Sequence, residues 1–215
     1  MFRLVIFDLD GTLLNTIGDL AAAGNHTLAE MGFPQHEEEK YRHFVGNGIP
    51  KLIERMLPAG HDKPTEEQAF AMFNEYYSLH KCDHTKPYPG IPELISEIKA
   101  QGVICGANSN KADEFSRELI RLNFGDDITH VIGYGAGFQP KPDPGAALEI
   151  IRRTGVKPEE ALYVGDSDVD IMTGHNAGIA VCAALWGFRS YEELAAKQPT
   201  FFAHDAGELK KVILG

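Results

Sequence analysis

The sequence predicts an α/β protein: a doubly wound parallel sheet core into which a small all-helical domain is inserted. Two observations support this prediction. Short apolar runs rich in β-branched or aromatic residues alternate with helical stretches, which is typical of a parallel sheet covered by helices on both faces. Between the first and second runs, however, the chain contains roughly ninety residues, where a crossover needs only a dozen or more, and the excess, about Thr16 to Cys82, has a helical pattern.

The apolar runs give the predicted strands in order. Five runs predict buried strands and a sixth is a further candidate: Leu4–Phe7, Val103–Ala107, His130–Tyr134, Ala161–Val164, Ile179–Ala184 and Phe201–Ala203. Amphipathic stretches between and after them predict the helices that cover the sheet: Ile91–Ala100, Lys111–Leu122, Pro144–Thr154, Val169–Asn176 and Ala206–Leu214.

The inserted domain has its own helical pattern and clear boundaries. Its predicted helices are Asp19–Met31, Ile49–Leu57 and Thr65–His80, separated by turns that contain glycine and proline. We therefore expect the core to comprise residues 1–15 and 83–215, and the inserted domain to comprise residues 16–82. The return to the core passes through Lys86–Gly90, a proline-rich turn suited to a hinge.

Composition excludes several classes of function. The chain carries 20 Lys and Arg against 31 Asp and Glu, a formal charge of −11, which argues against binding the nucleic-acid backbone. No apolar stretch predicts a membrane span or a signal peptide, and the three cysteines form no Cys-x-x-Cys pair. We expect a cytoplasmic protein whose anionic ligands need local positive groups or a metal ion.

The first predicted strand ends in a group of polar residues. In open parallel sheets, ligands bind beyond the carboxyl ends of the strands. Asp8 and Asp10 follow the first strand and, being two residues apart in extended chain, point to the same side. Gly11 permits a sharp turn after them, and the amides of Gly11 and Thr12 are expected to face an anion.

The other strand ends add complementary groups. Ser109 and Asn110 follow the second strand, immediately before a predicted helix whose N-terminus favours anions. Lys141 follows the third strand. Asp166 and Asp170 follow the fourth, and Asp168 between them is interpreted as the N-cap of the next helix.

Together these side chains predict phosphoryl transfer. Clustered carboxylates repel one another and need a hard cation, and oxygen ligands of this kind suit Mg²⁺. One carboxylate could attack phosphorus, and a second could protonate the leaving oxygen and later activate water. Ser109 and Lys141 would hold the phosphoryl oxygens.

These residues resemble the four motifs of the haloacid dehalogenase superfamily of phosphohydrolases. The matching motifs are Asp8-x-Asp10-Gly11-Thr12, Ser109-Asn110, Lys141-Pro142 and Gly165-Asp166-Ser167-x-x-Asp170. The resemblance implies that Asp8 is the nucleophile and Asp10 the acid/base. It also implies that Asp8, the main-chain carbonyl of Asp10 and Asp166 hold Mg²⁺, with Asp170 supporting the metal site. The inserted domain resembles the small helical cap of this superfamily.

A finer resemblance concerns the substrate. Val45-Gly46-Asn47-Gly48 in the inserted domain and Pro87-Tyr88-Pro89-Gly90 after it are similar to phosphoglycolate phosphatases. The expected substrate is therefore a small phosphorylated metabolite, 2-phosphoglycolate, with Asn47 and Gly48 contacting it. An alternative is that these glycines only end one helix and start the next.

Other functions remain open on the sequence. Within the superfamily these are a sugar-phosphate phosphatase, a pyrophosphatase and a phosphomutase. From a different class, the chain could be a catalytically silent phosphate-binding module. The sequence does not indicate the oligomeric state.

Overall fold

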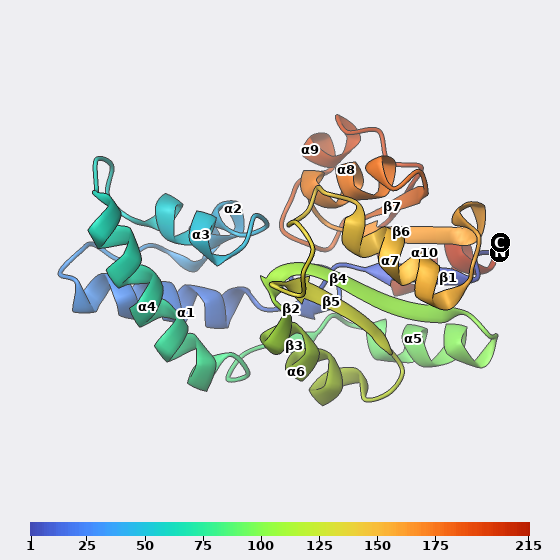
Figure 1. Cartoon of the computed structure of the whole chain (residues 1–215), viewed down its shortest axis with the longest axis horizontal. Coiled ribbons are helices and arrows are strands. Elements are labelled where there is room, and N and C mark those ends of the chain that lie inside the picture. Colours follow the sequence, from blue (N-terminus) through green and yellow to red (C-terminus); the bar gives the residue numbers. More distant parts are fainter. The chain divides into compact units, whose positions relative to one another are not determined.

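The computed structural model describes residues 1–215, and the chain divides into two compact units. The sheet unit comprises Met1–Leu14 and Pro87–Gly215, and the helical unit comprises Asn15–Lys86 (Figure 1). The expected inserted range, residues 16–82, lies inside the helical unit. A membrane span would need a longer or more apolar helix than any in this structure.

A six-stranded parallel sheet forms the centre of the sheet unit, and the predicted fold class is confirmed. The strand order is β5-β4-β1-β6-β7-β8. The strands are β1 (Leu4–Phe7), β4 (Ile104–Ala112), β5 (His130–Tyr134), β6 (Ala161–Gly165), β7 (Ala180–Ala184) and β8 (Phe201–Ala203). In the central strand, Leu4 is aligned with Ile104 of β4 on one side and Ala161 of β6 on the other.

Alternate residues of β1 enter two different cores, because successive side chains of a strand point to opposite faces. Val5 and Phe7 pack in the core beneath α5 (Ile91–Ala100), α6 (Asp113–Phe124) and α10 (Ala206–Leu214). Leu4 and Ile6 pack in the core beneath α7 (Gly145–Thr154), α8 (Asp168–Asn176) and α9 (Tyr191–Ala195). All four side chains are fully buried, so β1 is held rigidly and fixes the residues that follow it.

The predicted boundary between β4 and α6 is wrong in a way that matters for the site. The helix was expected from residue 111, but β4 continues to Ala112 and α6 begins at Asp113. The pairing of β4 with β5 shifts register between Asn108 and Ala112, which accommodates the extra extended residues. Lys111 therefore belongs to the strand end, and the α6 N-terminus does not directly follow Asn110.

Four helices make up the helical unit: α1 (Ile17–Glu30), α2 (Glu38–Phe44), α3 (Ile49–Met56) and α4 (Lys63–His80). Helix α2 was not predicted. Its Tyr41 side chain is fully buried, as are Phe73 and Tyr77 of α4, so these aromatic rings supply much of the unit's core.

The chain enters and leaves the helical unit through two short paired strands, β2 (Leu14–Asn15) and β3 (Lys86–Pro87). Just before β3, the returning chain is tied to the first turn of α1. The Asp19 carboxylate, 1% exposed, accepts hydrogen bonds from the amides of His84 at 2.8 Å and Thr85 at 2.9 Å.

Candidate active site

Three buried carboxylates meet at the carboxyl edge of the sheet. Asp8 follows β1, Asp166 follows β6, and Asp170 lies in the first turn of α8. One carboxylate oxygen from each lies within 4.8 Å of the others. Because the strands are parallel and adjacent, residues far apart in the chain converge here, as the sequence predicts.

Lys141 links two of these acids. Its Nζ lies 2.7 Å from Oδ1 of Asp8 and 2.6 Å from Oδ1 of Asp170, and the lysine side chain is 3% exposed. The second oxygen of Asp170 accepts hydrogen bonds from the amide and hydroxyl of Ser167, which caps α8. The N-cap prediction for Asp168 is therefore wrong: Asp168 is the first helical residue, and the shorter Ser167 side chain caps the helix.

Asp166 is held by two donors from different parts of the sheet unit. It accepts hydrogen bonds from the Thr12 hydroxyl at 3.1 Å and from the Phe188 amide at 2.7 Å. Two glycines make room for it, since a Cβ on Gly11 or on Gly187 would lie 2.2 Å from an Asp166 atom. Gly11 also has a φ of +84°, which disfavours other residues. Sequence reasoning missed Gly187 and Phe188, because nothing local marks them as neighbours of Asp166.

The electrostatics of this cluster favour a bound cation. Burial, reinforced by the charge of Asp170, raises the pKa of Asp8 well above its usual value and that of Asp166 to about 7. Although burial opposes it, Asp170 and Asp8 raise the pKa of Lys141. The site's four acids, Asp10 included, exceed its two lysines, Lys111 and Lys141, by two formal negative charges. A divalent cation would balance this excess.

Asp10 pairs with a lysine that the sequence analysis did not identify. The Nζ of Lys111 lies 3.2 Å from Oδ1 of Asp10, and the two side chains are 1% and 13% exposed. The sequence predicts that α6 starts at residue 111, two residues before its observed start, and that prediction assigns Lys111 to a helix instead of the strand end. A strand continuing through the Asn-Ser-Asn-Lys run would have placed it at the sheet edge.

Several predicted ligand groups bond within the protein. The Gly11 amide donates to the carbonyl of Leu14 at 2.9 Å, and the Thr12 amide donates to the carbonyl of Leu9 at 3.4 Å. The sequence predicts that both amides face an anion, but in the structure both bond to the backbone. The Asn110 side chain bonds both the amide and the carbonyl of Lys141, at 2.8 and 3.3 Å. Asn110 therefore positions the loop that carries Lys141.

Ser109 is buried at the end of β4, with 5% of its surface exposed. Its hydroxyl oxygen accepts a hydrogen bond from the Lys111 amide at 3.2 Å, and its own proton is available for a further acceptor. This placement at the carboxyl edge agrees with the position at which the sequence put it.

Asn47 and Gly48 lie in the helical unit. The Asn47 carbonyl oxygen accepts a hydrogen bond from Arg55 at 2.7 Å, and Arg55 also donates to the carbonyl of Phe44 at 2.9 Å. Gly48 is the N-cap of α3, with a φ of +83°. The glycine turn thus ends α2 and starts α3, and Arg55 stabilises it through the Asn47 side-chain oxygen.

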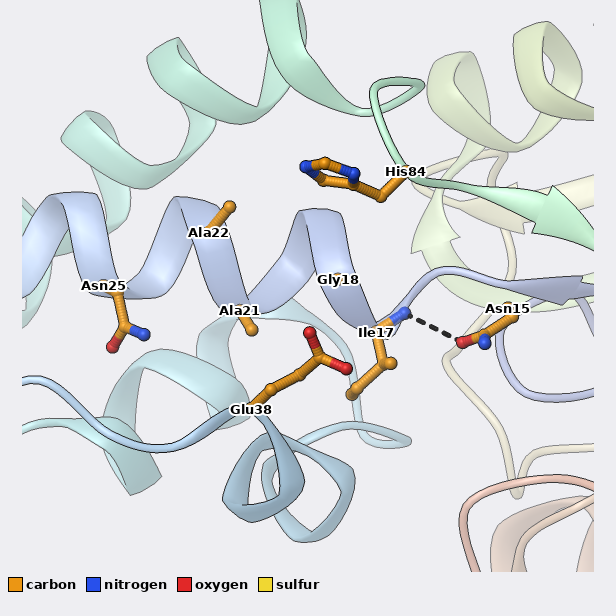
Figure 2. A pocket seen from close by; sticks show the side chains of 8 residues that line it. All are labelled: Asn15, Ile17, Gly18, Ala21, Ala22, Asn25, Glu38 and His84. Atoms are coloured by element: carbon orange, nitrogen blue, oxygen red, sulfur yellow. Dashed lines mark hydrogen bonds between the residues drawn. The ribbon is translucent and has the colours of Figure 1, made fainter.

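The helical unit also contains a pocket of about 460 Å³ beside the N-terminal half of α1. Its lining residues are labelled in Figure 2: Asn15, Ile17, Gly18, Ala21, Ala22, Asn25, Glu38 and His84. Gly18 allows α1 to lie close to the segment that carries His84, since a Cβ at position 18 would lie only 3.1 Å from the His84 Cβ. The Asn25 side chain has a structural role, because it hydrogen-bonds to the backbone carbonyl and amide of His36.

Comparisons with known proteins agree on one family. The family model described as haloacid dehalogenase-like hydrolase matches residues 5–184. A phosphoglycolate phosphatase of Aquifex aeolicus is 34% identical over 212 residues, covering 98% of this chain and 96% of the relative. Phosphoglycolate phosphatase 1 of Pseudomonas aeruginosa is 36% identical over 214 residues, covering 96% of this chain and 78% of the relative. The crystal structure of a predicted phosphoglycolate phosphatase from Haemophilus somnus superposes with a TM-score of 0.92 at 27% identity, covering 98% of this chain and 97% of that one.

Proposed function

We propose that this chain, which belongs to the haloacid dehalogenase-like hydrolases and is a phosphoric monoester hydrolase, hydrolyses 2-phosphoglycolate. The proposed reaction needs Mg²⁺ and passes through an aspartyl-phosphate. The observation that supports this proposal best is the buried cluster of Asp8, Asp166 and Asp170 around Lys141. The names of the two bacterial relatives support the choice of substrate.

The carboxylate cluster fits a magnesium ion. Mg²⁺ prefers oxygen ligands, and a buried excess of two negative charges matches its charge. Asp8, Asp166 and the main-chain carbonyl of Asp10 would hold the ion, and Asp170 would support the site. When bound, the ion would neutralise the site enough for a phosphate dianion to approach and would polarise the phosphoryl oxygens.

Asp8 performs the first chemical step in this proposal. A carboxylate oxygen of Asp8 attacks phosphorus, forming a new P–O bond while the bond from phosphorus to the ester oxygen breaks. Lys141 and Ser109 bind the phosphoryl oxygens. Lys141 is within hydrogen-bond distance of Asp8, so it also orients the nucleophile.

Asp10 moves the protons. In its protonated form it donates to the departing ester oxygen, which leaves as the alcohol, glycolate in the proposed case. As a carboxylate it then accepts a proton from a water that attacks phosphorus. The bond between phosphorus and the Asp8 oxygen breaks, which releases inorganic phosphate and restores Asp8.

The experiment that tests this function is metal removal. We expect EDTA to abolish hydrolysis of 2-phosphoglycolate and of p-nitrophenyl phosphate, and added Mg²⁺ to restore both, because the carboxylate cluster stays repulsive without a cation. Phosphate release is measured after exchange into metal-free buffer. Full activity in that buffer would refute the proposed mechanism. A chain that binds phosphate but turns over neither ester would be a silent binding module.

Substrate choice is tested by a panel of phosphate esters. We expect 2-phosphoglycolate to exceed hexose phosphates in kcat/KM. We also expect Asn47→Ala to reduce that preference more than it reduces p-nitrophenyl phosphate hydrolysis, because the proposal assigns Asn47 to the recognition of the leaving group. Lys51→Ala, an exposed change in α3, is the matched control. A sugar phosphate or pyrophosphate that wins by tenfold, about 1.4 kcal/mol, would replace the proposed substrate.

Gly187→Ala tests how Asp166 is positioned. The added methyl group would lie 2.2 Å from the Asp166 Cβ, so the carboxylate has to shift from the cluster. We expect the Mg²⁺ concentration for half-maximal activity to rise about 10- to 100-fold, the usual effect of mutating residues that contact and orient metal ligands. Gly207→Ala is the control, since its methyl group meets only an Asp205 oxygen, at 3.2 Å. An unchanged Mg²⁺ requirement in Gly187→Ala would contradict this role.

A further inference from the structure

The carboxyl edge of the sheet holds a second buried lysine that the proposed chemistry does not use. Lys141 pairs with Asp8 and Asp170, whereas Lys111 pairs with Asp10 at 3.2 Å. Both lysine side chains are almost completely buried, 3% and 1% exposed. One cation therefore lies beside the proposed nucleophile and the other beside the proposed acid/base.

The backbone of Lys111 is held firmly. Its amide donates to the Ser109 hydroxyl oxygen at 3.2 Å, and its carbonyl accepts from the Ser116 hydroxyl of α6 at 3.3 Å. These bonds involve only the backbone of residue 111, so they fix the strand end without the lysine side chain. An ammonium group is costly to bury without an anionic partner, and Asp10 is the partner that the fold supplies.

We propose that Lys111 binds a second anionic group of the substrate and selects phosphate esters that carry a carboxylate on the ester carbon. This inference rests on the proposed function, because it takes Asp10 as the group that protonates the ester oxygen. Lys111 then distinguishes 2-phosphoglycolate from esters of neutral alcohols.

The geometry supports this assignment. An acid that protonates the ester oxygen lies within hydrogen-bond distance of it, and Lys111 Nζ is within 3.2 Å of that acid. In 2-phosphoglycolate only two carbon atoms separate the carboxylate oxygens from the ester oxygen. A substrate placed for protonation by Asp10 therefore brings its carboxylate into reach of the Lys111 ammonium group, where a charge-assisted hydrogen bond forms.

A different role for Lys111 would be to orient the Asp10 carboxylate. That role affects all esters of aliphatic alcohols equally, since their departing oxygens need the same proton. The two roles separate when substrates of equal size differ only in the second charge. 2-Phosphoglycolate and 2-hydroxyethyl phosphate form such a pair, because a carboxylate is replaced by a neutral hydroxymethyl group.

The test measures kcat/KM for both esters in wild type and variants. We expect Lys111→Met to lose about 100-fold on 2-phosphoglycolate, the scale for removing one partner of a buried charge pair, and less than tenfold on 2-hydroxyethyl phosphate. Lys111→Arg keeps the charge and should retain most of the preference. Arg117→Met, an exposed change on α6, should leave the ratio unchanged.

A binding measurement separates this inference from the proposed function. With Mg²⁺ present, calorimetry compares 3-phosphonopropionate, which carries the carboxylate, with propylphosphonate, which does not. We expect wild type to bind the first more tightly and Lys111→Met to bind both alike. If wild type discriminates in this way but hydrolyses neither ester, the proposed function fails and the Lys111 assignment stands. Equal losses on both esters, or no preference in wild type, would overturn the assignment.

Discussion

Asp8→Asn should lower kcat by about 10⁴-fold or more, the scale on which enzymes lose activity when a nucleophile is removed. The amide has the shape of the carboxylate but cannot attack phosphorus. The fold should survive the substitution. Burial and repulsion by Asp170 raise the pKa of Asp8, which means that the charged carboxylate is unfavourable there, and a neutral amide removes the repulsion. Single-turnover phosphate release and thermal unfolding measure the two effects separately.

The matched control for Asp8→Asn is Asp168→Asn. Asp168 is the first residue of α8 and is absent from the carboxylate cluster, so its loss should change kcat by less than about twofold. Trapping the intermediate with labelled substrate gives a direct check. Label found on any residue other than Asp8, or a small loss in Asp8→Asn, would contradict the assignment of the nucleophile.

Asp10→Asn should lower kcat on 2-phosphoglycolate by about 100- to 10,000-fold, the usual contribution of general acid–base catalysis. The loss should be smaller for formation of the intermediate from p-nitrophenyl phosphate, because p-nitrophenolate leaves without being protonated. Rapid-mixing measurements of the first turnover resolve this step. The same loss with both esters in that step would show that Asp10 does not act as the acid.

Strand positions were the most predictable part of the fold. β1 and β5 occupy the residues that their apolar runs predict, because short apolar runs of this kind are typical of parallel strands that are buried on both faces of a sheet. Helix α2 could not be predicted in the same way. Its sequence, EEKYRHF, is mostly charged, and only Tyr41 and Phe44 are buried, so no apolar period marks it.

In the site, the residues at the strand ends were predictable, whereas their hydrogen-bond partners were not. Asp8, Asp166 and Lys141 come together as the sequence predicts, because each follows a strand of one sheet, and parallel strands end at one edge. Their roles in catalysis remain predictions. The partners of these residues were not predictable, since the Phe188 amide that bonds Asp166 lies 22 positions further along the chain. Such a contact depends on how the loop after β7 folds back.

The paired strands β2 and β3 also bear on how the chain folds. β1 and β4 are neighbours in the sheet, yet the entire helical unit lies between them in sequence. Closing a loop costs conformational entropy that grows by about 0.6 kcal/mol for each doubling of its length, and contacts of high sequence separation slow folding. Once α1 is formed and Asp19 has bonded the amides of residues 84 and 85, the two ends of the insertion lie together. The sheet then has only a short loop to close, so an insertion of this length need not delay nucleation of the central strands.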